Sequence, residues 1–158
     1  MLFRSAEDLL RYLPGSRTGS VHVELFPEVD HLADPALVAT WSRLLGVRDQ
    51  VNAALEQKRK DKVIGNSLSA HVTLTASGPV AATLGQYRAY LPTLFIVSDL
   101  EVQLGAIDGP DTVTVAVDKA RGTKCDRCWR FVPHVRTEPA WTGICDRCVD
   151  ALAEPVKS

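Results

Sequence analysis

The chain has 158 residues, of which 46% are hydrophobic and 23% are charged, proportions that are typical of a soluble globular protein. This length suits one ordinary domain or a few small pieces that share a surface. No stretch approaches the roughly 18 apolar residues that span a bilayer, and the N-terminus MLFRSAEDLL carries acidic groups where a signal peptide needs an apolar run. We therefore expect a cytoplasmic protein that has no membrane partner.

The net charge of −1 hides an asymmetry between the two ends of the chain. Residues 1–118 hold ten Lys/Arg and fourteen Asp/Glu, whereas residues 119–158 hold eight and five. A basic tail on a mildly acidic body favours a polyanionic partner for the tail. The alternative interpretation is that these are ordinary solvated charges around a metal site.

The first part of the chain predicts helices separated by one extended segment. Residues 5–15 read as a short helix that ends at Pro14-Gly15. Residues 20–30 read as an extended segment, because apolar and polar residues alternate there until Pro27. Asp34-Pro35 is a strong helix start, since it places an N-cap carboxylate before a proline.

The helix that starts there is expected to be long and amphipathic. A charged run, EQKRKDK, extends it into solvent until Gly65 or Asn66 closes it. A length of about 28 residues suits one member of a helical bundle. Its apolar residues recur on one side, namely Leu37, Trp41, Leu44, Leu45, Val51 and Leu55.

The second part of the chain predicts a small α+β unit. Residues 68–76 alternate apolar and polar side chains as a half-buried strand does, and residues 80–91 read as a second helix. Residues 93–105 supply one or two strands and residues 112–120 another, with Gly109-Pro110 as a turn between strands. A strand, a helix and two or three more strands are typical of a small α+β unit.

No active site is recognisable in the sequence. A lone histidine on a strand, such as His71, is far more often a surface or packed residue than a catalyst. No Ser-His-Asp order, paired-carboxylate motif or glycine-rich phosphate loop stands out. We therefore predict no catalytic residue in this chain.

All four cysteines lie in one stretch, CDRCWRFVPHVRTEPAWTGICDRC, as two Cys-x-x-Cys pairs sixteen residues apart. The spacing of Cys125, Cys128, Cys145 and Cys148 matches the pattern of a structural zinc site. Two residues between the members of a pair let a tight turn aim both sulfurs at one ion, and two such turns complete a tetrahedron. Because four thiolates leave no position for water, we predict one Zn²⁺ with a structural role.

Other uses of the four thiols are less favoured. Iron is the main competitor for four thiolates. A redox dithiol would need one pair at a helix N-terminus in a thioredoxin-like pattern, and two disulfides conflict with the expected compartment. Four thiolates around Zn²⁺ carry a formal charge of −2. Basic residues beside the ligands can offset it, namely Lys124, Arg127, Arg130 and Arg147.

The aromatic and basic residues among the cysteines point to a nucleic acid. Trp129 directly follows a ligand cysteine, with Arg127 and Arg130 on either side of it. An exposed indole between guanidinium groups suits stacking on an unpaired base while the arginines hold phosphates. The alternative is that Trp129 packs on the metal site, as Phe131 is expected to do. The predicted RNA-binding residues are Lys124, Arg127, Trp129, Arg130 and Arg136.

Five stretches carry a resemblance to a known family, namely KCDRCWRFVPHV, GICDRCVDAL, SVHVELFPEVD, WSRLLGVRDQVNAALEQKRKDKVIGNSLSAHVTL and LFIVSDLEV. The first two resemble the C-terminal zinc finger of bacterial-type isoleucyl-tRNA synthetases, and the other three occur upstream in the order that this family shows. The resemblance covers nearly the whole chain. The chain departs from the family at His134 and Arg136, where members often show an acidic residue and a glycine.

The resemblance implies both a fold and a set of partners. It implies the end of an anticodon-binding helical bundle, a small α/β junction and a zinc domain, all within a longer enzyme. It also implies binding to the anticodon stem-loop of an isoleucine tRNA, in support of ATP-dependent aminoacylation. The catalytic and editing domains would be further partners. ATP would bind only to the catalytic core, because the HIGH and KMSKS signatures do not occur here.

We therefore predict an α+β fold in three parts. These are the C-terminal helices of an anticodon-binding bundle (1–65), a small junction domain (66–118) and a zinc-finger domain (119–158). Two alternatives to a tRNA-recognition part of the synthetase stay open. The chain could be a free-standing zinc-dependent RNA-binding module derived from a synthetase, or a structural end domain whose finger packs on the catalytic body.

Overall fold

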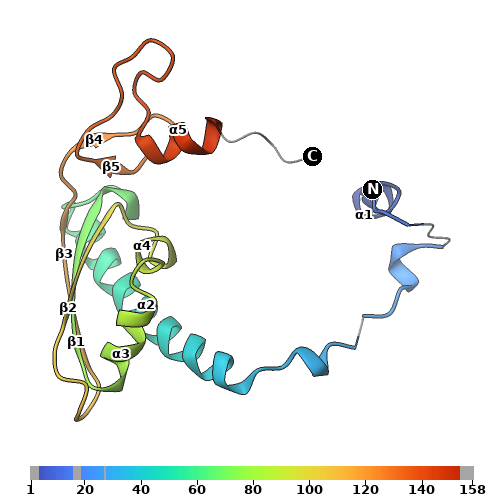
Figure 1. Ribbon diagram of the computed structural model, residues 1–158, viewed down its shortest axis with the longest axis horizontal. Helices are drawn as coiled ribbons and strands as arrows, with labels where there is room; N and C mark the ends of the chain where they lie inside the picture. Colours follow the sequence, from blue (N-terminus) through green and yellow to red (C-terminus); the bar gives the residue numbers. More distant parts are fainter. Residues whose placement is uncertain (1–3, 16–18, 27, 154–158) are drawn as a thin grey trace. The chain divides into compact units, whose positions relative to one another are not determined.

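The computed structural model describes residues 4–15, 19–26 and 28–153, and the chain forms two compact units, residues 1–35 and 36–158 (Figure 1). Helices and strands are both present, which agrees with the predicted α+β class. No helix in the described ranges is long and apolar enough to cross a membrane.

The first unit is built from short helical segments. Helix α1 (Arg4–Leu10) forms where a helix was predicted. Two 3₁₀ turns follow, η1 (Val21–Val23) and η2 (Asp30–Leu32). The Ser20 side chain caps η1 by accepting a hydrogen bond of 3.2 Å from the His22 backbone N–H.

The extended segment predicted at residues 20–30 is contradicted at Val21–Val23, which form η1, whereas Ser20 and Glu24 on either side of it are extended. The side chains of Val23, Leu25 and Phe26 are largely exposed. Alternating residues form a strand only where a neighbouring strand pairs with them and one sheet face is covered. The described residues of this unit include no strand that could do so.

The second unit begins with one long helix, α2 (Pro35–Lys60), and Pro35 is its first residue as predicted. The first part of the predicted apolar stripe is not buried, since Leu37, Trp41 and Leu45 are exposed by 40–46%. The buried residues lie further along and recur at the spacing of one helix face, namely Leu44, Val47, Val51 and Leu55.

Helix α2 ends at Lys60, a few residues earlier than expected. Lys62 takes the left-handed backbone conformation, with φ at 59°, and the Val63 N–H donates back to the Lys58 carbonyl at 3.0 Å. A left-handed residue just after the last turn is a common way for a helix to end. The chain then reverses toward the sheet.

A three-stranded sheet with strand order β2-β1-β3 forms the second layer. Strand β1 (Ala70–Ser77) lies between β2 (Asp99–Leu104), which is parallel to it, and β3 (Thr112–Lys119), which is antiparallel. The segment that holds Gly109-Pro110 connects β2 to β3, as the turn prediction required. The predicted alternation of β1 is confirmed by its buried residues, Ala70, Val72, Leu74 and Ala76.

Helices α3 (Pro79–Gln86) and α4 (Leu91–Leu94) connect β1 to β2 and lie with α2 on one side of the sheet (Figure 1). The helix predicted over residues 80–91 ends at Gln86 instead. Of the one or two strands predicted within residues 93–105, one forms, β2. Pro92 lies in the first turn of α4, where a proline is tolerated.

The apolar core of this unit lies between the helices and the sheet. It extends from α2 to β3, and its largest fully buried side chains are Phe95, Leu44, Leu74, Leu84 and Leu91. Gly78 lets the chain turn from β1 into α3, since its φ is 80° and a Cβ there would lie 2.6 Å from the Pro110 carbonyl oxygen. Only glycine fits this position.

The last part of the second unit has much smaller elements. Strand β4 (Thr123–Lys124) pairs antiparallel with β5 (Phe131–Val132), and a loop then leads to helix α5 (Asp146–Ala153). We call residues 120–153 the finger and residues 36–119 the α/β part. The three-domain division of the chain at residues 65 and 118 stays a prediction.

Candidate functional site

The four cysteines meet inside the finger. Cys125 and Cys128 lie in the turn between β4 and β5, whereas Cys145 directly precedes α5 and Cys148 lies in its first turn. Cys125, Cys145 and Cys148 are buried, and Val132, Val135 and Ile144 pack around them. The finger is therefore organised around its sulfurs.

The sulfur positions fit a tetrahedral metal ion. All four Sγ atoms lie within 4.8 Å of one another. The Cys125 and Cys148 sulfurs are 3.9 Å apart, and the Cys128 and Cys145 sulfurs are 3.7 Å apart. A tetrahedron with zinc–sulfur bonds of about 2.3 Å has edges of about 3.8 Å, so these distances suit one ion bound by four thiolates. They also exclude disulfides, whose sulfurs lie about 2.05 Å apart.

The surroundings of the sulfurs give the thiols of Cys125 and Cys145 different pKa values. Burial alone would raise the pKa of the Cys125 thiol. Hydrogen bonds from the backbone N–H groups of Cys128, Cys145 and Arg127 outweigh this effect and lower the pKa to about 6. One of these is the Cys145 N–H, which donates to the Cys125 sulfur at 3.3 Å. Burial raises the pKa of Cys145 itself to about 12, and the neighbouring thiols raise it too. The N–H donors at Cys125 stabilise its thiolate, which is the form that binds a metal.

Two arginines lie against the cluster and offset its negative charge. The Arg127 Nη1 atom donates to the Cys148 sulfur at 3.6 Å. Burial raises the pKa of the Cys128 thiol, but hydrogen bonds from the Arg130 backbone N–H and the Arg147 guanidinium lower it by more, and the bond to this sulfur raises the pKa of Arg147. The other two residues expected to offset the charge, Lys124 and Arg130, make different contacts.

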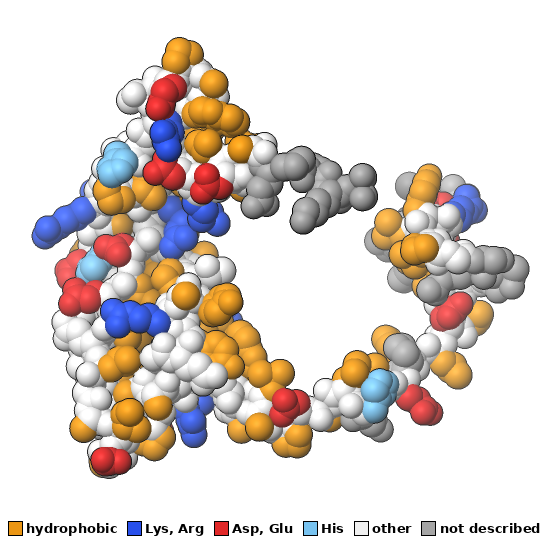
Figure 2. Space-filling view, viewed as in Figure 1, with side chains coloured by type: hydrophobic (Ala, Val, Ile, Leu, Met, Phe, Trp, Pro, Cys, Tyr) orange, Lys and Arg blue, Asp and Glu red, His pale blue; other side chains and the backbone are white. Residues whose placement is uncertain are grey.

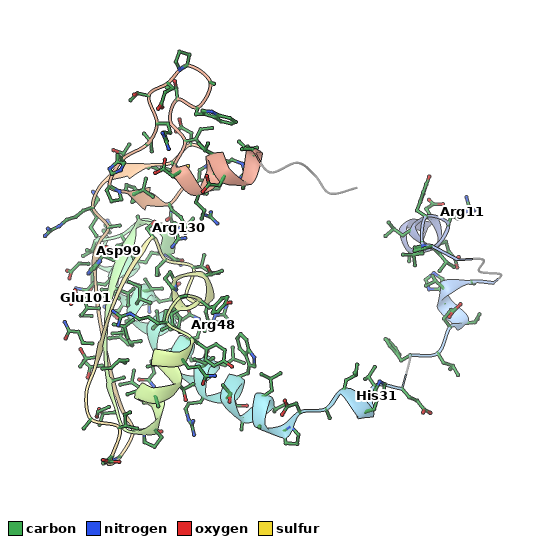
Figure 3. The ribbon with its side chains drawn as sticks, viewed as in Figure 1. Arg11, His31, Arg48, Asp99, Glu101 and Arg130 are labelled. Atoms are coloured by element: carbon green, nitrogen blue, oxygen red, sulfur yellow. The ribbon has the colours of Figure 1, made fainter. Side chains whose placement is uncertain are left out.

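Arg130 attaches the finger to the α/β part. Its Nη2 atom donates to the carbonyl oxygens of Val97 and Ser98, at 3.0 and 3.3 Å, and Figure 3 labels it where the two parts meet. Ser98 completes this joint, since its hydroxyl accepts from the Phe131 N–H at 2.7 Å and donates to the Leu68 carbonyl. These bonds fix how the finger sits on the α/β part.

A basic groove lies beside this joint and is lined by residues from both parts. Its volume is about 560 Å³, within the usual range of ligand sites. Four cations line it, Arg59, Lys62, Lys119 and Lys124, together with Trp129 and Phe131 and with residues of the segment from Val63 to Ser69. No carboxylate is among the described residues that line it. Figure 2 shows Lys and Arg side chains, with Asp, Glu and His side chains near them, at the level where the finger meets the α/β part.

Trp129 is the most unusual residue of this groove. Its side chain is 61% exposed, and Lys124 Nζ lies 5.5 Å from the centre of its ring, within the range of a cation–π contact. Its backbone is left-handed, with φ at 64°. This conformation closes the cysteine turn, because the Trp129 N–H donates to the Cys125 carbonyl while the Cys125 N–H donates to that of Arg130. Glycine adopts this conformation more readily, so the backbone of the turn does not explain why a tryptophan stands here.

Arg136 lies in a different setting from the groove. Its guanidinium forms ion pairs with Asp146 and Glu138, and these carboxylates raise its pKa. Of the five predicted RNA-binding residues, only Lys124 and Trp129 line the groove. Arg127 contacts a sulfur, Arg130 contacts the joint, and Arg136 contacts carboxylates.

His71 lies on the sheet, where a surface role was predicted. Its Nδ1 atom is 2.8 Å from a carboxylate oxygen of Asp99, the residue opposite it on β2. The hydroxyl of Thr73 lies 3.3 Å from its Nε2 atom. An exposed pair across two strands is an ordinary sheet contact.

Sequence reasoning missed the residues that the α/β part contributes to the groove. Arg59 and Lys62 belong to the run EQKRKDK, which was interpreted as a solvated end of the helix. Lys119 was counted in the basic tail but was not assigned to a site. The run of charges was the available signal, but the sequence could not place it opposite Trp129. No pattern in the sequence around Ser98 indicated its role at the joint.

Known proteins with similar sequences identify the family of this chain. No protein-family model matches the chain. The chain is 39% identical over 158 residues to the isoleucine–tRNA ligase of Syntrophotalea carbinolica, and 36% identical over 155 residues to that of Geobacter sulfurreducens. It is 34% identical over 161 aligned positions to that of Petrotoga mobilis. The three matches cover 95%, 94% and 98% of this chain, and 17% of each relative.

The chain belongs to the isoleucine–tRNA ligase family. It spans about 17% of the length of the curated relatives it matches, at their C-terminal end, and holds none of their catalytic core. The resemblance drawn from the sequence is thereby confirmed. Of the predicted finger, the four-cysteine group is found in a form that can hold one metal ion.

Proposed function

We propose that this chain is the tRNA-recognition part of an isoleucine–tRNA ligase, and that it binds the anticodon stem-loop of isoleucine tRNA. In the full enzyme it supports ATP-dependent aminoacylation, with ATP held by the catalytic core and with the catalytic and editing domains as its partners in a cytoplasmic protein. The observation that carries the proposal is an exposed indole in a cationic groove, in a chain of this family.

Trp129 and Lys124 make the central contacts in this proposal. An unpaired base stacks on the open face of the indole, while Lys124 stays at the ring and attracts the phosphate beside it. Single-stranded loops are the parts of an RNA whose bases can be reached in this way, because the bases of a double helix are already stacked. A tRNA anticodon loop has this property.

The three arginines contribute in a secondary way. A guanidinium carries five N–H donors, so each arginine keeps donors beyond those bound to protein atoms. Arg127, Arg130 and Arg136 can use these donors toward phosphates at the edge of the RNA. Their first roles are those described above, at a sulfur, at the joint and at two carboxylates.

We infer that the metal ion held by Cys125, Cys128, Cys145 and Cys148 is one structural Zn²⁺. The donor set supports this, because four thiolates at tetrahedral distances are typical of structural zinc, with iron as the main competitor. Bound to these sulfurs, the ion would fix the turn that presents Trp129. No open position would be left for catalysis.

The test is tRNA binding by the Trp129→Ala variant. In the full-length ligase that carries this C-terminus, the variant should lose roughly 1–3 kcal/mol of tRNA affinity and keep its zinc. Aminoacylation should fall mainly through tRNA affinity. If the variant instead releases zinc and melts at a lower temperature, Trp129 is a packing residue, and the alternative of a structural end domain gains.

A further inference from the structure

We propose that the end of α2 and the end of β3 form a phosphate-binding wall, in which Arg59, Lys62 and Lys119 hold the backbone of an unpaired RNA segment whose base stacks on Trp129. This inference rests on the proposed function and extends the binding surface beyond the finger. The RNA would then bridge the finger and the α/β part.

The two walls of the groove come from different parts of the second unit. Arg59 and Lys62 lie at the end of α2 and Lys119 ends β3, whereas Lys124 and Trp129 belong to the finger. Three of the four cations of the groove are therefore outside the finger. A ligand that contacted only the finger would leave these three cations without a contact to it.

The wall on the α/β part is held rigidly. The Asn66 side chain accepts from the Ser69 N–H at 3.0 Å, and the Ser69 hydroxyl accepts from the N–H groups of Gly65 and Asn66, each at 3.2 Å. The Ser69 carbonyl accepts from the Ala120 N–H at 2.8 Å, directly beside Lys119. Because this turn is fixed by hydrogen bonds, little ordering of the backbone is needed when a ligand binds.

A simpler explanation for cations at this place is the helix dipole. The last turn of α2 carries Lys58, Arg59 and Lys60, and positive side chains stabilise the C-terminal end of a helix. That explanation covers Lys60, which does not line the groove, as well as it covers Arg59. It does not cover Lys119 on β3 or the gathering of cations around an exposed indole. Lys60 is therefore a control for a cation of the same turn outside the groove, although Arg59 also forms an ion pair with Glu56.

An unpaired RNA segment fits this groove better than an acidic protein segment does. Both would neutralise the cations. An acidic peptide, however, would gain little from an exposed indole, whereas each nucleotide brings a flat base together with a phosphate. One wall can then hold the phosphates and the other the base of the same ligand.

The experiment compares single variants of the zinc-loaded 158-residue chain. These are Arg59→Gln, Lys62→Gln and Lys119→Gln, with Lys60→Gln as control and Trp129→Ala as the variant that reports on the finger. Because Lys62 is left-handed, Lys62→Asn is a second variant that keeps the turn, since asparagine tolerates this conformation. All should melt within the same range as Lys60→Gln.

The probes are a labelled stem-loop RNA with the anticodon-arm sequence of isoleucine tRNA, the same strand annealed to its complement, and a polyglutamate peptide. Affinity is measured across a range of salt concentrations. Each groove variant should bind the stem-loop several-fold more weakly than Lys60→Gln, with the salt slope reduced by about 0.7 for each lost phosphate contact. The affinity for the fully paired RNA should be the same with Trp129 and with Trp129→Ala.

The outcomes separate this inference from the proposed function. If Trp129→Ala weakens binding while the groove variants match Lys60→Gln, the wall is not used and only this inference fails. If none of the variants weakens binding, both fail. If polyglutamate displaces the RNA and binds at least as tightly, the groove is a site for an acidic protein segment, and the inference is overturned.

Discussion

The α/β part and the finger differ in what holds them together. The α/β part encloses an apolar cluster that runs from Leu44 to Val117, whereas the buried cluster of the finger consists of three cysteines. Burying one large aliphatic side chain contributes roughly 1.5–3 kcal/mol, so the α/β part has the means to fold by itself. The finger lacks them and depends on bonds from its sulfurs.

This difference matters because the groove draws one wall from each part. The wall that carries Arg59, Lys62 and Lys119 belongs to the part with the apolar core, and the wall that carries Trp129 belongs to the finger. We therefore expect the first wall to persist in the metal-free chain and the second to be lost. The predictions below test that contrast, from the largest expected effect to the smallest.

Removing the metal should have the largest effect. A strong chelator should unfold residues 120–153 and leave the secondary structure of the α/β part, since structural Zn²⁺ contributes roughly 10–16 kcal/mol in small zinc domains. Circular dichroism should show a partial loss of signal, and elemental analysis should find one Zn²⁺ per untreated chain. Complete cooperative unfolding on chelation would mean that the two parts share one core.

Replacing a metal-binding cysteine, or lowering the pH, should also remove the metal. Cys125→Ser and Cys145→Ser should each lose the metal, because each removes one of four ligands. In the metal-free chain burial raises the pKa of Cys145 to about 12, so this thiol is protonated at neutral pH and metal binding displaces its proton. Metal affinity should therefore fall as pH falls, which a zinc-sensitive dye can follow. An affinity that does not depend on pH would contradict this.

A change in the apolar core should destabilise the α/β part without affecting metal binding by the finger. Phe95→Ala should lower the free energy of unfolding of the α/β part by about 3–5 kcal/mol, because Phe95 is almost fully buried. Urea unfolding followed by circular dichroism measures this change, and the zinc content in native buffer should stay at one ion. The control is Ile107→Ala, whose side chain is 59% exposed, with an expected change within about 0.5 kcal/mol.

The joint tests whether the two parts work together. Ser98→Ala leaves the Phe131 N–H without its acceptor, which should cost about 1–3 kcal/mol. Zinc content should not change, but affinity for the stem-loop RNA should fall, because the two walls of the groove are no longer fixed to each other. Ser77→Ala is the control, since that hydroxyl pairs with Thr112 across two strands, away from the finger. Equal affinities of the two variants would show that the joint does not position the groove.

What the sequence could predict follows the same contrast. The four-cysteine group and the start of α2 at Pro35 were predictable, because their signals are spacings and neighbours within a short stretch. The alternation of β1 was predictable because one sheet face is covered by helices. The segment at residues 20–30 has the same alternation, but no strand among the described residues pairs with it, and the pattern alone could not tell the two apart.

The groove and the joint could not be predicted in this way. Arg130 is one of several arginines near the cysteines, and only the fold places it at the carbonyl groups of Val97 and Ser98. Lys62 and Lys124 are far apart in the sequence, and they line one groove because the finger sits beside the end of α2. Contacts of this kind depend on tertiary placement, to which local patterns are insensitive.

The smallest expected effect comes from two residues with the same backbone conformation, one in each part. Ile96 ends α4 with φ at 56° and is 54% exposed, and Trp129 has φ at 64° and is 61% exposed. A left-handed conformation costs a residue other than glycine about 1–2 kcal/mol, partly offset in a glycine variant by about 0.5–1 kcal/mol of lost chain entropy. Ile96→Gly should therefore raise the free energy of unfolding of the α/β part by up to about 1 kcal/mol, with RNA affinity unchanged.

Trp129→Gly should likewise leave the metal-bound finger at least as stable as before, since its turn prefers glycine, while RNA affinity falls. The measurements are urea unfolding for Ile96→Gly and zinc retention against a graded chelator for Trp129→Gly. Should Trp129→Gly give up zinc more easily than the unmodified chain, the indole would contribute to folding, and its exposure and strain would no longer favour a binding role. Should Ile96→Gly also weaken RNA binding, left-handed residues in both parts would contribute to recognition, and the contrast between a self-supporting wall and a presenting wall would have to be abandoned.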